Sequence, residues 1–191
     1  MTKVVLINGK KRSGKNHLAE LLSSELNDKG YSTEIMAFAD PIKDIIGMAL
    51  DISSEELDMY KNNDEHLGIN DVGMYNDEFQ FLVSFRVLLQ KFGTEAMKKY
   101  FGEDVWVNIL KTRAQNSDAD VVLVPDFRFL SESISDLSIN IFNNNLVEHD
   151  SHRSENELND FKFSKYVDNT GKPDLSEKVK ELAKWIIESK N

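Results

Sequence analysis

The sequence predicts an α/β fold: a three-layer sandwich around a mainly parallel, roughly five-stranded sheet, in one domain spanning residues 1–191. Three observations predict it. Short β-branched apolar runs alternate with segments whose apolar residues recur at helical spacing. The first such run leads through a glycine-rich loop into a helical pattern. The chain has 191 residues, of which 40% are hydrophobic, and this is enough for one substantial core.

The first elements are a strand over Lys3–Asn8 and a helix from Lys15 to about Lys29, closed by Gly30. Between them lies Gly-Lys-Lys-Arg-Ser-Gly at 9–14. Glycines let such a loop bend and aim several N–H groups at a phosphate, and the helix that follows adds the positive end of its dipole. The pattern predicts a P-loop NTPase-type fold in which Lys15 reaches the β- and γ-phosphates. A chance glycine–lysine loop is the alternative, and the flanking strand and helix count against it.

The loop departs from the usual motif at one position. Asn16 stands where a serine or threonine normally coordinates Mg²⁺. An amide oxygen can bind Mg²⁺ directly or through water, but it is a weaker ligand than a carboxylate. We therefore expect Asn16 to take part in binding Mg²⁺ or an ordered water, and this substitution makes the metal affinity the main open question.

The middle of the chain begins with a strand over 33–37 and a turn at Phe38–Pro41. Asp40 is predicted to cap the helix that follows, with Pro41 at its first position. Residues 51–78 then hold nine acidic residues and one base, Lys61, so this segment carries −8 of the net charge of −10. We expect irregular structure there, either as a functional segment or as a solvated insertion.

The remaining elements follow from apolar periodicity and turn residues. Gly93 is expected to break the chain's helical pattern, with Thr94 capping the next helix. Ser154 and Glu157 form a capping-box pattern. The predicted helices span 79–91, 94–101, 104–115, 154–158 and 175–189, and the predicted strands span 120–124, 139–142 and 166–169.

Composition excludes several classes of protein. The negative net charge disfavours general nucleic-acid binding, which needs a basic stripe, so the cluster Lys10, Lys11, Arg12 and Lys15 is better interpreted as a local attraction for polyphosphate. No apolar run is long enough for a membrane helix, and no signal peptide is evident at the start. The absence of cysteine favours a reducing, cytoplasmic setting.

Asp126 and Arg128 come directly off the predicted strand 120–124. Ligands of open α/β sheets bind beyond the carboxyl ends of the strands, so these side chains should project into the same crevice as the loop. Asp126 is a candidate metal ligand, or else a turn cap. Arg128 is a candidate phosphate clamp, or else a surface ion-pair partner. Arg86 and Gln90 lie four residues apart and should share one helix face.

The loop alone indicates only that a nucleoside triphosphate binds. No guanine-reading Asn-Lys-x-Asp follows a strand, which disfavours a GTPase. The order and spacing of several motifs resemble those of the bacteriophage deoxynucleoside monophosphate kinase family along nearly the whole chain. The motifs are Gly-Lys-Lys-Arg-Ser-Gly-Lys at 9–15, Phe-Ala-Asp-Pro-Ile-Lys at 38–43, Arg-Val-Leu-Leu-Gln at 86–90, Phe-Gly-Thr-Glu at 92–95, Trp-Val-Asn at 106–108, Asp-Phe-Arg at 126–128, His-Arg-Ser-Glu at 152–155 and Val-Asp-Asn-Thr-Gly at 167–171.

The resemblance implies ATP- and Mg²⁺-dependent phosphorylation of deoxynucleoside monophosphates, a phage origin with a host-cytoplasmic setting, and a homodimer. It also implies an acceptor-side region at about 41–115 and a lid at about 143–160. The expected catalytic residues are Lys15, Arg86, Asp126 and Arg128, and the expected metal ligands are Asn16 and Asp126. ATP is expected to contact Gly9, Lys11, Arg12, Ser13, Gly14, Lys15, Asn16, His17, Arg153, Asn169 and Gly171. The acceptor is expected to contact Phe38, Asp40, Lys43, Arg86, Gln90, Thr94, Trp106 and Arg128.

Two other functions stay open at this point. Animal-type phosphomevalonate kinases show a similar loop and similar late Ser-Glu and Asn-x-Gly stretches. The second open function is that of a nucleotide-binding protein without catalytic activity. Phe38, Phe92 and Trp106 favour a stacking base as acceptor, although each is equally a candidate for the core. His149 and His152 are weak candidates, because two histidines in a polar loop are usually exposed.

Overall fold

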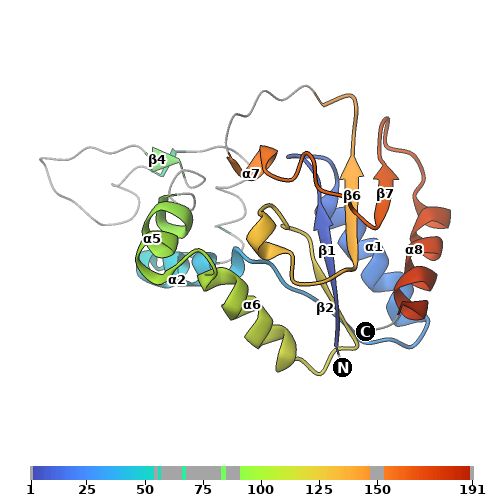
Figure 1. The fold of residues 1–191 in the computed structure, drawn as a ribbon, viewed down its shortest axis with the longest axis horizontal. Helices are drawn as coiled ribbons and strands as arrows, with labels where there is room; N and C mark the ends of the chain where they lie inside the picture. The colour runs from blue at the N-terminus through green and yellow to red at the C-terminus, as the bar shows by residue number, and fades with distance from the viewer. Residues whose placement is uncertain are drawn as a thin grey trace, which may run out of the picture. The chain divides into compact units, whose positions relative to one another are not determined.

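The computed structural model describes residues 2–53, 56, 66–67, 83–84, 91–146 and 153–189. The chain separates into two compact units, one formed by residues 1–38 and 107–191 and the other by residues 39–106. The first unit holds a five-stranded parallel sheet flanked by helices (Figure 1), as the sequence predicted. Among the described residues of both units, no helix is long and apolar enough to cross a membrane.

The sheet has the order β2-β5-β1-β6-β7. Its strands are β1 (Lys3–Asn8), β2 (Thr33–Ile35), β5 (Val121–Val124), β6 (Ser138–Phe142) and β7 (Lys165–Asp168). From β1 the chain proceeds to β2 on one side, and from β6 it proceeds to β7 on the other. The connections therefore diverge at the carboxyl ends of β1 and β6, which is where open α/β sheets form their binding crevice.

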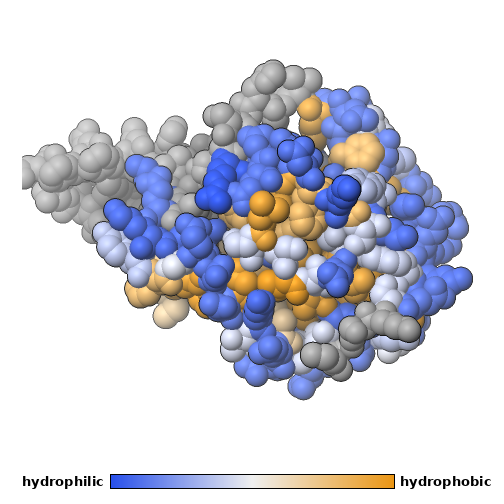
Figure 2. Space-filling view, in the orientation of Figure 1, coloured by the Kyte–Doolittle hydropathy of each residue, from blue (hydrophilic) through white to orange (hydrophobic). Residues whose placement is uncertain are grey.

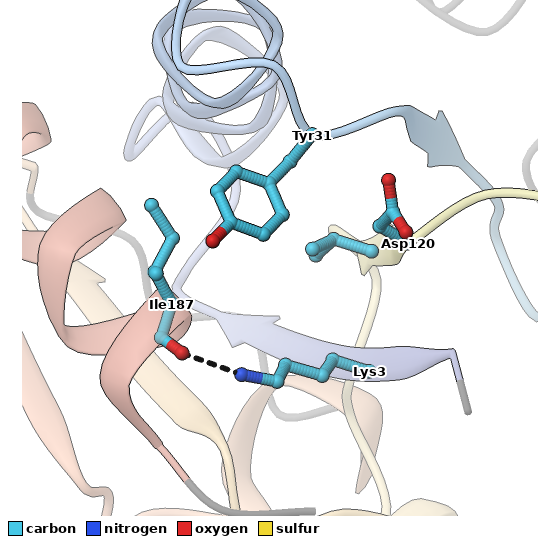
Figure 3. A pocket seen from close by; sticks show the side chains of 5 residues that line it. Lys3, Tyr31, Asp120 and Ile187 are labelled. Carbon is cyan, nitrogen blue, oxygen red and sulfur yellow. Dashed lines mark hydrogen bonds between the residues drawn. The ribbon is translucent and has the colours of Figure 1, made fainter.

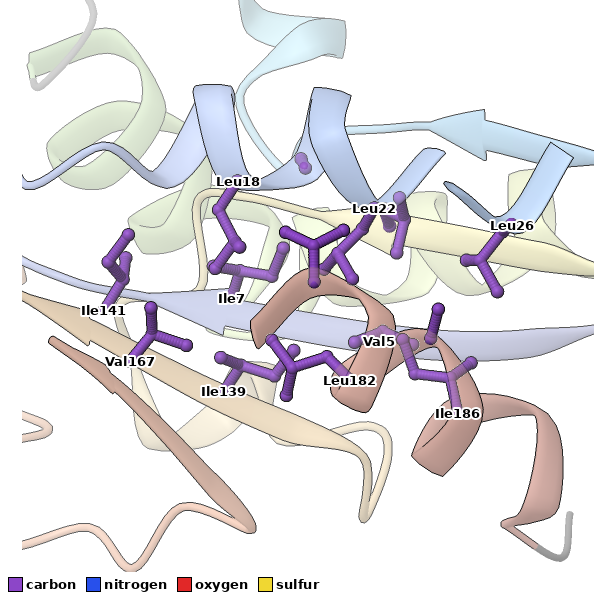
Figure 4. Close-up of a cluster of buried hydrophobic side chains, with 14 of the residues drawn as sticks. Val5, Ile7, Leu18, Leu22, Leu26, Ile139, Ile141, Val167, Leu182 and Ile186 are labelled. Carbon is purple, nitrogen blue, oxygen red and sulfur yellow. The ribbon is translucent and has the colours of Figure 1, made fainter. Parts of the chain in front are cut away.

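One face of the sheet is covered by α1 (Lys15–Asp28) and α8 (Ser176–Glu188). Alternate residues of β1 and β6, Val5, Ile7 and Ile139 among them, point into this layer and are fully buried. Figure 4 shows Leu18, Leu22 and Leu26 of α1 facing the same cluster as Leu182 and Ile186 of α8. The spacing of four residues places the three leucines on one helix face, which is why the sequence predicted both helices.

The other face carries the alternate set of strand residues, including Leu6, Val122 and Val124, which are also buried. The helix α6 (Val105–Gln115) contributes buried Val107, Leu110 and Ala114 to the first unit. All four residues of β5 are buried, as expected for a parallel strand covered on both faces. A three-layer sandwich is thus confirmed.

The second unit contains α2 (Asp40–Leu50), the short hairpin of β3 (His66–Leu67) and β4 (Val83–Ser84), a π-helix η2 (Lys91–Lys98) and α5 (Lys99–Phe101). The predicted helix over 79–91 is wrong at Val83–Ser84, which pair antiparallel with β3; residues 79–82 and 85–90 lie outside the described part. The irregular structure predicted for 51–78 likewise gives way to a strand at His66–Leu67. Backbone pairing between two distant segments is a long-range effect that local periodicity does not reveal.

Two predicted helix starts in this unit are also wrong. Ala39, not Asp40, is the N-cap of α2, so Asp40 lies in the first turn, where a carboxylate faces the positive end of the helix dipole. Gly93 lies inside η2 instead of breaking a helix, and Thr94 is therefore not a cap. A Cβ at Gly93 would lie 2.6 Å from Cδ1 of Ile42, so the glycine is needed for close packing against α2.

The helices α1, α6 and α8 lie close to their predicted positions, whereas the 3₁₀ helix η3 (Leu130–Glu132) was not predicted and the helix near residue 154 differs. The helix α7 covers Arg153–Asn156, so Ser154 lies within it and does not cap it.

Exposed large apolar side chains are scattered through both units, and the face in Figure 2 shows hydrophobic areas interrupted by hydrophilic ones. These side chains are Ile35, Ile45, Met48, Tyr100, Phe101, Leu130 and Tyr166.

At the amino-terminal edge of the sheet, Lys3 joins the two ends of the chain. Its Nζ donates hydrogen bonds to the carbonyl oxygens of Ile186, Ile187 and Ser189 at 2.8–2.9 Å. Figure 3 shows Lys3 and Ile187 lining a cavity of about 110 Å³ with Tyr31 and Asp120. The lysine both satisfies carbonyls that α8 leaves unpaired and complements the negative end of its dipole.

Asp120 in the same cavity is bound to Ser32, whose backbone N–H and hydroxyl each donate to Oδ2 at 2.8 Å. These hydrogen bonds, the backbone one first, lower the pKa of Asp120 below its ordinary value. Both charged residues of this cavity thus make bonds that hold elements together, Lys3 to α8 and Asp120 to the start of β2. The cavity is therefore lined by residues with structural roles, from β1, β5, α8 and the turn after α1.

Lys3→Met is expected to lower the free energy of unfolding by about 1–2 kcal/mol, because three carbonyls lose a charged donor. Urea denaturation followed by circular dichroism measures the change. Lys184→Met is the matched control, since Lys184 is an exposed residue of the same helix, 3.8 Å from Glu188. Equal effects of the two substitutions would show that Lys3 does not hold the end of α8.

Candidate functional site

The glycine loop connects β1 to α1 at the carboxyl edge of the sheet, as predicted. The N–H of Ser13 donates to the carbonyl oxygen of Lys10 at 3.1 Å, and the N–H of Leu18 donates to that of Gly14 at 2.9 Å. Arg12 and Gly14 adopt left-handed backbone conformations, with φ of 62° and 102°. This sharp reversal brings the chain from the end of the strand directly into the first turn of the helix.

Lys15 folds back into the loop. Its side chain is only 8% exposed, and its Nζ donates to the carbonyl oxygens of Gly9 at 2.6 Å and Lys10 at 2.8 Å. The ammonium group therefore sits inside the bend of the loop, beside the start of α1. A positive charge held there, together with the dipole of α1, is suited to neutralising an anionic ligand.

The loop leaves no space for additional side chains. A Cβ on Gly9 would overlap the carbonyl oxygen of Ile141 and Oγ of Ser13, and a Cβ on Gly14 would lie 2.6 Å from Nδ2 of Asn169. The hydroxyl of Ser13 is fully buried and has no hydrogen-bond partner among the described residues. Buried polar atoms are rarely left unpaired, so this hydroxyl is a specific position at which a bound ligand could supply the missing partner.

Asp126 lies just after β5, next to a residue that is bonded to the end of β1. Leu6 pairs with Val124, the last residue of β5, so Asp126 follows the strand next to β1 by two residues. Nδ2 of Asn8 donates to the carbonyl oxygen of Phe127 at 2.8 Å, which ties the two strand ends together. Oδ1 of Asp126 accepts the N–H of Phe38 at 2.9 Å, so the carboxylate is oriented by the segment that follows β2.

Arg128 is held through its backbone by Glu132, which the sequence analysis missed. Glu132 lies in the 3₁₀ helix η3 (Leu130–Glu132) and is only 4% exposed. Its Oε2 accepts the N–H groups of Arg128 at 2.8 Å and Phe129 at 3.0 Å. A buried carboxylate thus fixes the backbone from which the half-buried Arg128 side chain projects. A glutamate four residues after the arginine was the available sequence signal.

Arg153 lies next to the same segment. Its Nε pairs with Oε2 of Glu157, and its guanidinium carbon lies 5.6 Å from the ring centre of Phe129. Oε1 of Glu157 accepts the N–H of Leu130 at 2.8 Å. Glu157 therefore connects the end of the expected lid to the segment after β5, instead of completing the capping box that the sequence predicted.

Lys10 connects this region to the loop. Its Nζ lies within hydrogen-bonding distance of Oδ1 of Asn156, at 3.3 Å, and of Asn159, at 3.2 Å. Because both bonds are exposed, each contributes little stability, and Lys10 can exchange them for an anionic partner at small cost. The described end of the expected lid, 153–160, thus contacts the phosphate-loop candidate directly.

The turn after β7 reaches the loop from the other side. Nδ2 of Asn169 donates to the carbonyl oxygen of Ser13 at 2.9 Å, a contact that the sequence analysis did not anticipate. Gly171 lies two residues later in the same turn, with a left-handed φ of 75°. The hydroxyl of Thr170, and then its backbone N–H, lower the pKa of the neighbouring Asp168 by hydrogen bonding.

Four other residues that were predicted to contact the nucleotide lie around the loop and are exposed or half-buried. Asn16 and His17 are exposed on the first turn of α1, and Nδ1 of His17 lies 3.9 Å from Glu20. Arg12 is exposed and Lys11 is half-buried in the loop. These residues are thus accessible around the loop, while Ser13 and Lys15 form its buried interior.

The predicted acceptor residues fall mainly in the second unit. Trp106 is 3% exposed and its Nε1 donates to the carbonyl oxygen of Gly93 at 2.8 Å, so it forms part of the core there, and Phe38 is buried in the first unit. Asp40 and Lys43 are half-buried on α2. Arg86, Gln90, His149 and His152 lie outside the described residues, as does the side chain of Thr94.

The described residues contain no group of three or more His, Cys, Asp or Glu side chains that could hold a metal by themselves. Mg²⁺ at phosphate sites usually keeps several waters and takes one or two carboxylates together with phosphate oxygens. Asp126, oriented by Phe38 just after the end of β5, is one such carboxylate, and the exposed Asn16 amide could add a ligand directly or through water. The donor set is therefore suited to a metal that arrives with a phosphate ligand.

Comparison of the chain with protein-family models and with curated proteins found no match. We therefore infer a function from the geometry of the loop and its neighbours, together with the motif resemblance.

Proposed function

We propose that the protein is a phosphotransferase that phosphorylates deoxynucleoside 5′-monophosphates at the expense of ATP. The observation that carries the proposal is the interior of the loop at 9–15. It combines a nearly buried Lys15 ammonium with a Ser13 hydroxyl that has no partner among the described residues, and the strand next to β1 leads into the oriented carboxylate of Asp126. This arrangement supports binding of a polyphosphate, and the choice of acceptor rests on the resemblance in sequence.

In this proposal, the N–H groups of the loop and of the first turn of α1 bind the phosphates of ATP. Lys15 exchanges its carbonyl partners for phosphate oxygens and stabilises the charge that develops on the transferred group. Asp126 and Asn16 would hold Mg²⁺, which neutralises phosphate charge when bound. No general base is required, because phosphoryl transfer of this kind depends mainly on positioning and electrostatics.

The arginines supply the remaining positive charge. Arg128 projects from backbone fixed by Glu132 and acts as a phosphate clamp near the point of transfer. Arg153 turns from Glu157 towards the phosphates when the nucleotide binds. Arg86 binds the phosphate of the acceptor, with Gln90 and Thr94 close to its sugar or base. A homodimer is also part of the proposal, and multi-angle light scattering tests it.

A panel assay tests the function. The protein is incubated with ATP and Mg²⁺ and with each deoxynucleoside monophosphate, each ribonucleoside monophosphate or phosphomevalonate, and ADP formation is measured. Acceptor-dependent turnover with deoxynucleoside monophosphates is expected. Turnover with phosphomevalonate alone would favour the isoprenoid kinase. ATP binding without turnover on any acceptor would favour a non-catalytic nucleotide-binding protein.

Arg128→Ala is expected to lower kcat/KM at least about tenfold, equivalent to about 1.4 kcal/mol of transition-state stabilisation, because a phosphate clamp is lost. The same ADP assay measures the effect. Arg113→Ala, at an exposed position of α6, is the matched control and should leave kcat/KM within about twofold of the wild type. A loss of less than tenfold for Arg128→Ala would show that this side chain is not the clamp.

A further inference from the structure

Asn169 lies at the end of β7, far from the loop in sequence, yet its side chain contacts the loop directly. Nδ2 donates to the carbonyl oxygen of Ser13 at 2.9 Å, and the same atom would lie 2.6 Å from a Cβ placed on Gly14. We infer that Asn169 is a positioning residue that aims the Ser13–Gly14 peptide of the phosphate loop. This role rests on the proposed function, because it concerns the site at which the donor nucleotide would bind.

The geometry of a peptide explains how one hydrogen bond from Asn169 can orient the Ser13–Gly14 peptide. A trans peptide is planar, and its C=O and N–H groups point in opposite directions. By holding the carbonyl of Ser13 towards β7, Asn169 directs the N–H of Gly14 to the opposite side. Gly14 has φ of 102°, a conformation open to glycine, so neighbouring torsions would otherwise let this peptide rotate. The contact therefore selects one orientation of a flexible donor.

Asn169 is itself held by the strand ends around it. Its N–H donates to the carbonyl oxygen of Phe142 at 2.8 Å, and its carbonyl accepts the N–H of Lys172 at 3.2 Å. Thr170 accepts the N–H of Asn144 through Oγ1 at 2.9 Å, which joins the turns after β6 and β7. The amide of Asn169 thus projects from an ordered turn, and a fixed donor on a rigid support is suited to orienting a glycine peptide.

The consequence should be specific to the donor substrate. Misorienting the Gly14 N–H weakens binding of the phosphates of ATP but leaves residues of the second unit unchanged. We expect Asn169→Ala to raise both the Kd and the KM for ATP about fivefold, the scale of one lost hydrogen bond. The KM for the acceptor should stay within twofold. Asn169→Asp keeps the shape of the side chain but faces the Ser13 carbonyl with an acceptor, and its effect should be at least as large.

Glycine-selective ¹⁵N labelling provides a readout that a general loss of stability would not reproduce. The chain has nine glycines, so the spectrum is sparse and the Gly14 amide can be assigned by its loss in Gly14→Ser. Without nucleotide, both Asn169 variants should shift the Gly14 resonance while that of Gly30, at the end of α1, stays in place. Asn116→Ala, at an exposed asparagine just after α6, is the matched control and should move neither resonance.

Unchanged ATP affinity together with an unmoved Gly14 resonance in both Asn169 variants would overturn the positioning role. An equal rise in the KM of ATP and of the acceptor would also overturn it, because it would indicate general damage to the site. Absence of phosphoryl transfer by the wild-type protein would overturn the proposed kinase function alone, since ATP affinity and the Gly14 resonance are measured without an acceptor.

Discussion

Lys15→Met is expected to reduce kcat for phosphoryl transfer about a thousandfold, the largest loss that any single substitution in the chain should cause. Methionine keeps an unbranched apolar stem but has no ammonium. Lys15 is nearly buried and bonded to the carbonyls of Gly9 and Lys10, so its charge acts where few waters can screen it. The ADP assay with ATP and a deoxynucleoside monophosphate measures the loss.

Lys178→Met is the matched control, because Lys178 pairs with Glu181 on the exposed surface of α8. It should retain full activity. A reduction in kcat of less than about tenfold for Lys15→Met would contradict the assigned role. A lysine that only bonds to the carbonyls of the loop would contribute little to the reaction itself. Circular dichroism of both variants separates a catalytic loss from a folding defect.

Gly9→Ala is expected to lower the free energy of unfolding by about 2–3 kcal/mol and to abolish measurable ATP binding. The added methyl group would overlap the carbonyl oxygen of Ile141 and the buried hydroxyl of Ser13. The first is a backbone atom of the central sheet, so the strand or the loop must shift to relieve the overlap. Urea denaturation and a nucleotide-binding titration measure the two effects.

Gly30→Ala distinguishes overlap from backbone strain. Gly30 has φ of 85°, but a Cβ there would meet nothing within 4 Å. This control should cost only about 1–2 kcal/mol, from the strained backbone, and leave ATP binding intact. Equal losses of stability in the two variants would show that Gly9 is not required for the close approach of the loop to β6.

Much of the fold followed from the sequence because its elements have strong local signals. Leu18, Leu22 and Leu26 recur at helical spacing, and the apolar run before Pro125 is typical of a buried parallel strand. The hairpin of β3 and β4 was missed because its pairing joins residues distant in the chain. Gly93 was misinterpreted because its role depends on Ile42, which lies on another helix.

The course of the loop between its strand and helix was predicted because it depends on one continuous segment, whereas the contacts between segments were missed. The loop and its strand and helix are contiguous, so the spacing of Gly9, Gly14 and Lys15 was sufficient. The bonds from Glu132 to the Arg128 backbone and from Asn169 to Ser13 depend on the side chains' positions in three dimensions. Spacing alone does not distinguish such residues from ordinary polar surface residues.

The position of β1 between β5 and β6 has a consequence for how the protein is made. The strand that carries the loop is synthesised early, but its sheet neighbours begin only at Val121 and Ser138. At about 5–20 residues per second, a ribosome needs on the order of ten seconds to reach them. During that interval β1 lacks both of its neighbouring strands, and of the elements that cover Val5 and Ile7 in the folded protein only β1 itself and α1 have been synthesised.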